Sequence, residues 1–164
     1  MIPDSIEKIN RSQWLTFLDV SKTSTPSWKV LGIGITDYSV DYNPQVDTEK
    51  WIIEDNARSD HTANEKQGSV TQKTYKGDEL FEFVADGRDQ LNYKTHILDI
   101  DRWNGTGTGT SATYPAKLSD GKIVITSILG ENSEIEYDIY YDGEATDVTV
   151  TIGADGQPTI VTSL

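Results

Sequence analysis

The spacing of apolar residues predicts one helix in this chain, over about residues 78–91. Asp78 suits the N-cap position, because its carboxylate can accept a hydrogen bond from the free amides of a first turn. Gly87 destabilises a helix by about 1 kcal/mol relative to alanine, so we expect the last turn to fray or to end near it. Four apolar residues are expected to form the stripe that packs on a sheet: Leu80, Phe81, Val84 and Leu91.

Most of the remaining chain shows the apolar and polar alternation that is typical of β-strands. Within 28–42 the apolar positions change from odd to even numbers, which predicts a bulge near Thr36 and Asp37. Segment 122–129 is almost continuously apolar, as expected of a strand covered on both faces. The expected strands are 13–20, 28–42, 48–55, 70–75, 95–103, 122–129, 134–141 and 145–152.

Three Asp-Gly pairs occur among the last predicted strands, at positions 120–121, 142–143 and 155–156. Asp-Gly is a strong signal for the tight turns of antiparallel hairpins, so the pairs predict a meander. Many strands with a single helix indicate a mainly β fold of the α+β kind. At 164 residues, the chain is expected to form one domain over 1–164.

Two segments do not fit this pattern of packed strands. Residues 56–67 contain no large apolar side chain, so we expect a long exposed loop. Residues 1–13 are expected to form an N-terminal arm. A short helix is the alternative for this arm, because Ile2, Ile6 and Ile9 follow helical spacing.

Composition restricts the possible functions. The chain has no cysteine, which excludes disulfides, thiolate metal sites and a cysteine nucleophile. Its net charge of −13 argues against ordinary nucleic-acid binding, and on composition alone a role of this charge in solubility is an equally good explanation. No apolar run approaches the roughly 20 residues of a membrane-spanning helix, and the first residues do not resemble a secretion signal. We therefore expect no membrane partner, and a product made and assembled in a cytoplasm.

No set of residues forms a convincing catalytic, cofactor or metal site. His61 and His96 are the only histidines and do not have metal-ligand spacing. The run from Asp99 to Asn104 resembles a calcium loop, but its third ligand falls one position late. The alternating carboxylates Glu134, Glu136 and Asp138 fit a solvated strand face better than a glycosidase pair. We expect a protein that is not an enzyme and binds no cofactor.

Three segments in a fixed order carry a resemblance to a known family: 28–46 (WKVLGIGITDYSVDYNPQV), 51–55 (WIIED) and 75–84 (YKGDELFEFV). Their order and spacing resemble the major tail, or tail tube, proteins of long non-contractile tailed phages of Gram-positive bacteria. The similarity runs from about residue 14 to residue 84 and continues loosely beyond.

The resemblance implies a two-sheet antiparallel β-sandwich or partial barrel with the helix on its flank. Six subunits would join their sheets into a ring, and stacked rings would form a virion tube, assembled in the bacterial host cytoplasm, through which DNA passes as cargo. Further partners would be the tape measure, tail terminator and distal tail proteins. Channel-lining residues are expected at Glu134, Glu136 and Asp138. The loop at 56–67 would contact the next ring through Asn56, Arg58, Asp60, His61, Asn64, Glu65 and Lys66.

A β-sandwich module that binds carbohydrate or a host surface is the alternative function. In that case Trp51, Trp103 and tyrosines would stack on sugar rings. Self-association distinguishes the tube subunit from the binding module, since the edge strands of a tube subunit pair with those of its neighbours.

Overall fold

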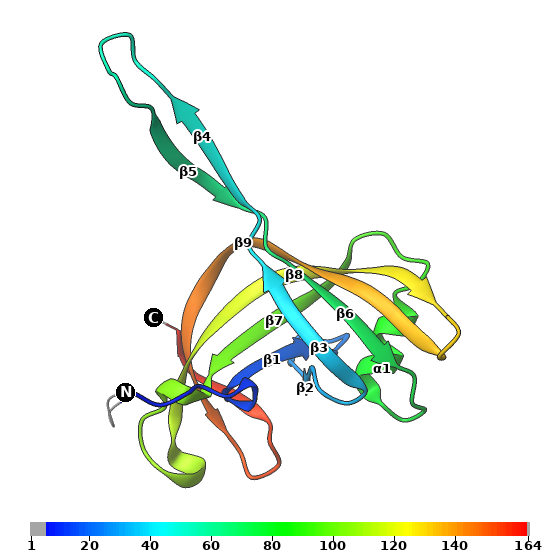
Figure 1. Cartoon of the computed structure of the whole chain (residues 1–164). Coiled ribbons are helices and arrows are strands. Elements are labelled where there is room, and N and C mark those ends of the chain that lie inside the picture. The colour runs from blue at the N-terminus through cyan, green and yellow to red at the C-terminus, as the bar shows by residue number, and fades with distance from the viewer. Residues whose placement is uncertain (1–5, 164) are drawn as a thin grey trace.

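A computed structural model describes residues 6–163 of the chain. One curled antiparallel sheet and one helix form the body, and a two-stranded hairpin projects from it (Figure 1). This is a mainly β fold with a partial barrel, as the sequence predicts. The strands are β1 (Trp14–Asp19), β2 (Trp28–Val30), β3 (Ile35–Asp41), β4 (Pro44–Glu49), β5 (Arg58–Asn64), β6 (Gln67–Lys73), β7 (Tyr93–Asp101), β8 (Thr113–Ile128), β9 (Glu134–Ile152) and β10 (Pro158–Ser163). The helices are α1 (Glu79–Asp86) and three 3-10 turns, η1 (Arg11–Gln13), η2 (Arg102–Asn104) and η3 (Gly109–Ser111).

The large sheet has the strand order β2-β1-β7-β8-β9-β6-β3, with β10 on the distal half of β9. Residues of β3 and β6 change register between Ile35 and Tyr38, which confirms the bulge expected near Thr36 and Asp37. The β3–β6 pair continues directly into β4–β5, because Asp41 pairs with Gln67 and Pro44 pairs with Asn64. The small sheet is therefore an extension of the large one beyond the body.

Helix α1 begins where the sequence predicts and ends earlier. The carboxylate of Asp78 accepts a hydrogen bond from the Leu80 amide at 3.1 Å, so the expected N-cap is formed. The helix ends at Asp86 and Gly87 caps it. A Cβ at Gly87 would lie 2.3 Å from the ring of Tyr93, so only glycine allows this ring to pack against the helix end.

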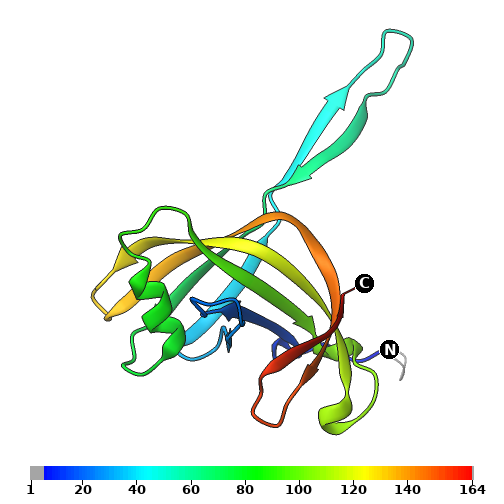
Figure 2. The ribbon, with the colours of Figure 1, turned by 180° about the vertical axis from the view of Figure 1, so that it is seen from behind.

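The helix covers one opening of the curled sheet, as the view from behind shows (Figure 2). Leu80 and Val84 are buried in the core and Phe81 packs at its margin, as expected. Leu91 was expected on the same apolar stripe. This expectation is wrong, because Leu91 lies beyond the end of the helix and is 94% exposed. Phe83 takes part in its place, and its ring lies 4.9 Å from the Tyr93 ring.

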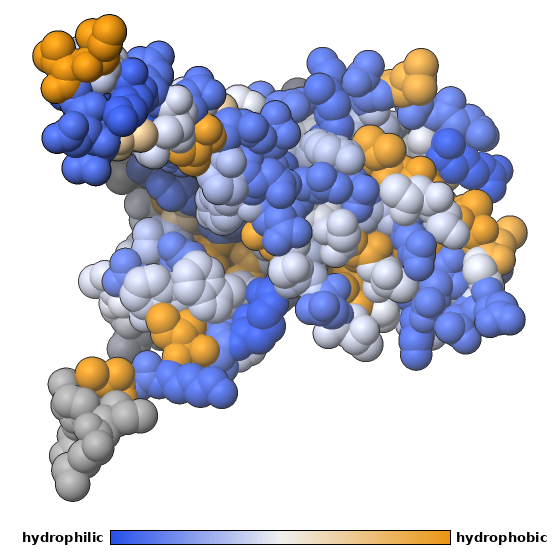
Figure 3. Space-filling view, turned by 45° about the horizontal axis from the view of Figure 1, so that its top comes forward, coloured by the Kyte–Doolittle hydropathy of each residue, from blue (hydrophilic) through white to orange (hydrophobic). Residues whose placement is uncertain are grey.

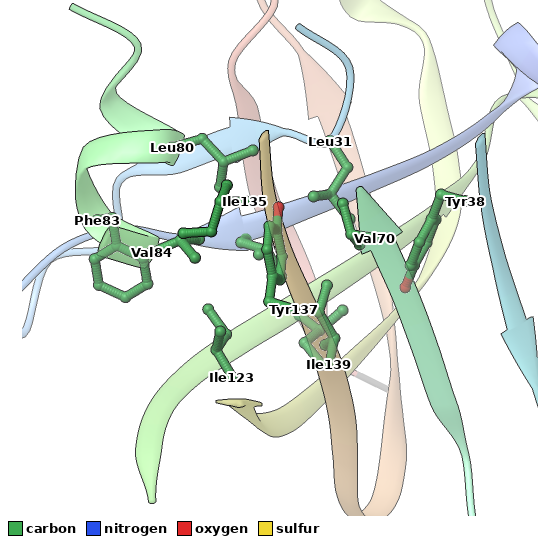
Figure 4. Packing of buried hydrophobic residues seen from close by; sticks show 12 residues of the cluster. Leu31, Tyr38, Val70, Leu80, Phe83, Val84, Ile123, Ile135, Tyr137 and Ile139 are labelled. Atoms are coloured by element: carbon green, nitrogen blue, oxygen red, sulfur yellow. The ribbon is translucent and has the colours of Figure 1, made fainter. Parts of the chain in front are cut away.

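The larger hydrophobic core lies between α1 and the concave side of the sheet (Figure 4). Alternate residues of β9, Ile135, Tyr137 and Ile139, are at most 1% exposed, as their alternation predicts. The hydroxyl of Tyr137 donates to Gln72 at 3.0 Å, which satisfies the polar end of a buried ring. A second, smaller core contains Phe17, Trp28, Leu98, Ile100, Ala116, Val148 and Val150.

The Asp-Gly signals were only partly correct. The third pair lies in the turn between β9 and β10, as expected, but Asp120-Gly121 lies inside β8 and Asp142-Gly143 lies inside β9. Near these two pairs, the pairing of β8 with β9 changes register, and Gly143 has a φ of +68°. The pairs therefore mark a bend in one long ribbon, and the turn between β8 and β9 falls at 129–133. The expectation that 122–129 is covered on both faces is also wrong, since Val124 is 45% exposed.

The N-terminal arm is described only in part. Residues 1–5, including Ile2, lie outside the described residues. Residues 6–10 form neither helix nor strand, and the only helical part of the arm within the described residues is the 3-10 turn η1 at Arg11–Gln13, which contains none of the three isoleucines of the alternative short helix. Ile6 and Ile9 are both exposed.

We predict that shortening a core isoleucine of β9 destabilises the fold. Ile139→Ala should lower the free energy of unfolding by about 2–5 kcal/mol, because the lost contacts leave a cavity among buried residues. The matched control is Ile33→Ala, at a position that is 63% exposed. This substitution should change the free energy of unfolding by less than about 0.5 kcal/mol. Denaturant unfolding measures both, and equal losses would contradict the position of the core.

Candidate functional site

The β4–β5 hairpin is the most prominent surface feature of the molecule (Figure 1). Every residue of both strands is exposed. At its end, residues 50–57 form the turn that we call the hairpin tip. Three consecutive large apolar residues lie there: Trp51 is 52% exposed, Ile52 102% and Ile53 85%. In the space-filling view, hydrophobic atoms lie at the outer end of the projecting segment at the upper left (Figure 3).

The hairpin corrects two expectations from the sequence. Residues 48–55 were expected to form a strand, but β4 ends at Glu49 and Trp51 lies in the tip. Residues 56–67 were expected to form a long exposed loop. Residues 56–65 are indeed exposed, but 58–64 are strand β5 and Gln67 begins β6. A strand exposed on both faces has no apolar face, so its sequence lacks the alternation that identifies strands.

Interactions within the hairpin order both its tip and its base. The Arg58 guanidinium lies 4.5 Å from the centre of the Trp51 ring and also pairs with Glu54. These contacts hold the tryptophan ring in one position relative to β5. Nearer the base, His61 Nε2 is 2.8 Å from Asn64 Oδ1. The tip is therefore an ordered apolar projection.

The residues expected to contact a neighbouring ring lie at three different levels of this hairpin. Asn56 is in the tip, and Arg58, Asp60, His61 and Asn64 are on β5. Glu65 and Lys66 connect β5 to β6, and the Glu65 carbonyl accepts a hydrogen bond from Asn43 Nδ2 at 3.1 Å. The structure thus brings them together on one element.

A cavity of about 1040 Å³ lies beside the base of the hairpin. Strand β1 pairs with β2 only from Phe17 onward, and β3 pairs only with β6, so the sheet has an open seam between the start of β1 and β3. The hollow is visible between the hairpin and the N-terminal segment (Figure 3). We call it the seam cavity, and its main lining residues are Trp14, Leu15, Thr16, Tyr38, Val40, Tyr42, Ala63, Lys66, Asp99, Ile100, Tyr141 and Ala145.

A polar network forms the floor of the seam cavity. Asp99 of β7 accepts hydrogen bonds from Thr16 Oγ1 at 2.6 Å and from the Tyr141 hydroxyl at 3.1 Å. The hydroxyl of Tyr141 is also 3.1 Å from that of Tyr38. Four strands, β1, β3, β7 and β9, are joined by these contacts. The network therefore holds the walls of the cavity at a defined separation.

Burial determines the protonation behaviour of this network. Loss of hydration raises the pKa of Asp99, although the hydrogen bonds from Thr16 and Tyr141 oppose the shift. Burial likewise raises the pKa of Tyr38 and of Tyr141. Both phenols consequently remain neutral donors over the physiological range.

Two cations lie at the mouth of the seam cavity. Lys66 Nζ is 4.2 Å from the centre of the Tyr141 ring and 5.2 Å from that of Tyr42. The Arg11 guanidinium is 6.0 Å from the centre of the Tyr38 ring and donates to the Trp14 carbonyl. Within residues 6–163, neither cation forms an ion pair with a carboxylate.

Aromatic residues near the cavity also include a pair of tryptophans. The rings of Trp14 and Trp103 are 5.8 Å apart and tilted by 42°, and both are more than two-fifths exposed. Trp51 was expected to act with Trp103 in sugar binding, but it lies at the far end of the hairpin, so the structure does not bring these two together.

The acidic residues of β9 lie on the convex side of the sheet. Glu134, Glu136 and Asp138 alternate with three buried residues and face away from the core. Asp138 accepts a hydrogen bond from Ser69 at 2.7 Å. Their separation from both core and seam cavity makes this a distinct, negatively charged face.

His96 lies beside a smaller cavity at the far side of the sheet. Its Nδ1 is 3.2 Å from Asp19, and its Nε2 is 3.5 Å from Asp120. Burial opposes ionisation of Asp19, but hydrogen bonds from the Ser27 and Ser21 amides outweigh it and lower the pKa of this carboxyl. These contacts anchor the 20–27 loop to β7, which is a structural role.

No potential metal-binding group of three or more ligands is present in the part of the chain that the structure describes. Across residues 6–163, the structure also contains no helix with the length and apolarity needed to span a membrane. In comparisons with known proteins, no family model matches the chain and no curated sequence matches it. The proposed function therefore rests on the geometry of the hairpin and the seam cavity.

Sequence reasoning missed the network in the seam cavity. Thr16, Tyr38, Asp99 and Tyr141 come from distant parts of the chain and share no local motif. Asp99 drew attention only as part of an incorrect calcium pattern. The alternation at 134–141 placed Tyr141 on the core-facing side correctly, but offered no partner for its hydroxyl.

We predict that the stability of Asp99→Asn relative to the unaltered protein increases with pH. The pKa of Asp99 is raised above its ordinary value of 3.8, so its stabilising contribution is complete below that value and is lost as pH rises through the folded-state pKa. The asparagine variant does not lose this contribution. Denaturant unfolding from about pH 4 to about pH 7 measures the difference.

Asp101→Asn is the control, because burial and the nearby Asp99 carboxylate raise the pKa of Asp101, but its carboxyl is less enclosed than that of Asp99. The stability of Asp101→Asn relative to the unaltered protein should change less with pH. A difference for Asp99→Asn that stays constant or decreases over this range would contradict the burial of the carboxyl.

Proposed function

We propose that this protein is a structural subunit of a hollow tube, the tail tube of a long non-contractile phage. Six copies form each ring, and rings stack to make a conduit for DNA. The observation that carries the proposal is the β4–β5 hairpin, an ordered element that projects from the body with its apolar tip exposed. Such an element has a physical reason to exist only when another molecule covers it.

The energetics of the tip support association. Trp51, Ile52 and Ile53 remain largely exposed in the single chain. Burial of a large apolar side chain contributes about 1.5–3 kcal/mol. Three adjacent residues on a preordered hairpin therefore provide substantial driving force, and the pairing of β4 with β5 reduces the entropy lost on binding.

The sheet margins support ring formation. Within the described residues, β2 pairs only with β1, β3 only with β6, and β10 only with β9. Each therefore presents backbone groups on one side that a neighbouring copy can pair with. Head-to-tail joining of such edges generates closed rings when the rotation between subunits closes.

The charge distribution supports a role as a conduit. The chain carries 27 acidic and 14 basic residues, and the convex face of β9 presents Glu134, Glu136 and Asp138. A negative channel wall repels DNA and allows it to slide. The tape measure, tail terminator and distal tail proteins are the further partners in this proposal, and the assembled virion tail is the location.

One observation favours a second candidate function, a carbohydrate-binding module. Trp14 and Trp103 form an exposed aromatic pair beside a cavity with polar residues, an arrangement on which a sugar ring could stack. A module of this kind acts as a single copy. It does not require the projecting hairpin, which is why the tube is our preferred function.

We predict that the apolar tip is required for assembly but not for folding. Ile52→Asp with Ile53→Asp should abolish rings and tubes in electron micrographs and leave a small species in sedimentation, with unchanged circular dichroism. Leu91→Asp, at another highly exposed position, is the control and should assemble normally. If the unaltered protein stays monomeric at high concentration and binds glycans, the second candidate is correct.

We also predict separate effects on assembly and on DNA passage for the acidic face. Changing Glu134, Glu136 and Asp138 together to lysine should preserve tubes, because these residues face away from the core. The positive wall should then retain DNA and reduce ejection by a tail that contains it. Unchanged infectivity would contradict a position in the channel.

A further inference from the structure

We infer that the seam cavity of each copy receives the hairpin tip of a second copy. The inference rests on the proposed function and deepens it, because it states where the projecting hairpin binds. Four observations lead to it: the reach of the hairpin, the chemistry of the cavity, the charges on both sides and the rigidity of each part.

The reach of the hairpin excludes binding within one chain. Tyr42 and Ala63 line the cavity at the base of the hairpin, whereas Trp51 lies at its far end. A strand rises about 3.3 Å per residue, so nine residues place the tip roughly 30 Å from its own cavity. Antiparallel pairing from Pro44 to Glu49, with one register shift between Gln45 and Val46, keeps the hairpin extended away from the cavity. The occupant must therefore come from another molecule.

The chemistry of the cavity matches the tip. Leu15 and Val40 provide aliphatic surface, and Trp14 and Tyr42 provide aromatic surface. The volume of about 1040 Å³ is at the upper end of the roughly 300–1,000 Å³ range of ligand sites. It is large enough for a cluster of side chains such as Trp51, Ile52 and Ile53.

The charges are complementary in a molecule that is otherwise acidic. Residues 44–64 contain five acidic and two basic residues, a formal charge of −3. Most of the surface of a chain with a net charge of −13 would repel this hairpin. The lining of the cavity carries three carboxylates, Asp99, Asp101 and Glu144, and three cations, Arg11, Lys66 and Lys117, so it has no net formal charge. Lys66 and Arg11 form no ion pair within residues 6–163, so an acidic hairpin is repelled less here than elsewhere and can pair with these two cations.

Both parts are ordered before they meet. The stacking of Arg58 on Trp51 orders the tip, and the hydrogen bonds of Asp99 join the strands around the cavity. Contact between two preordered surfaces loses little conformational entropy. Because tip and cavity are different surfaces of one chain, the contact is heterologous and leaves a free tip and a free cavity at the two ends. All copies in the assembly therefore have the same orientation along it.

Disulfide trapping tests the contact, and the absence of cysteine from the chain makes it specific. A tagged copy with Ile52→Cys is mixed with an untagged copy with Ala145→Cys, at an exposed position lining the cavity. Two cysteines form a disulfide only when their Cα atoms come within about 7 Å. The control partner is Ala154→Cys, at an exposed turn outside the cavity. Ala63→Cys, a second lining position, is used if the first variant does not fold.

The expected result is a tagged–untagged disulfide dimer that exceeds the control by about tenfold, because docking raises the local thiol concentration. Equal yields for the cavity and control positions would overturn the inference. Sedimentation of the unaltered protein is measured in parallel. Large assemblies without the specific disulfide would overturn only the docking site, whereas a monomer without the disulfide would overturn the proposed function as well.

Discussion

The pairing of β8 with β9 is the constraint on which the rest of the structure depends. These two long strands pair from Thr113 opposite Thr151 to Ile128 opposite Ile135. Strand β6 pairs with the first half of β9 and β10 with the second half, while β7 pairs with β8. The register changes near Gly121 and Gly143 let the ribbon bend. A straight ribbon would form a flat sheet, whereas this one curls around a core.

The curl explains both the seam cavity and the hairpin. Strand β1 is next to one end of the strand order and β3 is at the other end, so the curled sheet brings them near one another without pairing them. The polar network around Asp99 forms between them in place of a ladder. On the same margin, the β3–β6 ribbon runs past the body and becomes β4–β5. The ordered body thus supplies the base of an element whose tip has no partner within the described chain.

Local signals predicted the parts of the fold in which one face is buried. Asp78 caps α1, Gly87 ends it, and the alternation over 134–141 identifies the buried face of β9 correctly. Prediction failed where the pattern of apolar and polar residues in a segment does not match the burial of that segment. Strand β5 is exposed on both faces and reads as a loop, whereas Trp51 and its neighbours read as a strand although they form a turn.

The sequence by itself determined the mainly β class, the position of the helix and the acidic, cysteine-free character of the chain, because these follow from composition and from contacts between near neighbours. Only the tertiary structure decided that two Asp-Gly pairs bend a ribbon and that Leu91 lies outside the core. It also decided that Asp99 accepts hydrogen bonds from Thr16 and Tyr141. Such outcomes depend on which distant strands pair, and the pairing of distant strands is a property of the whole chain.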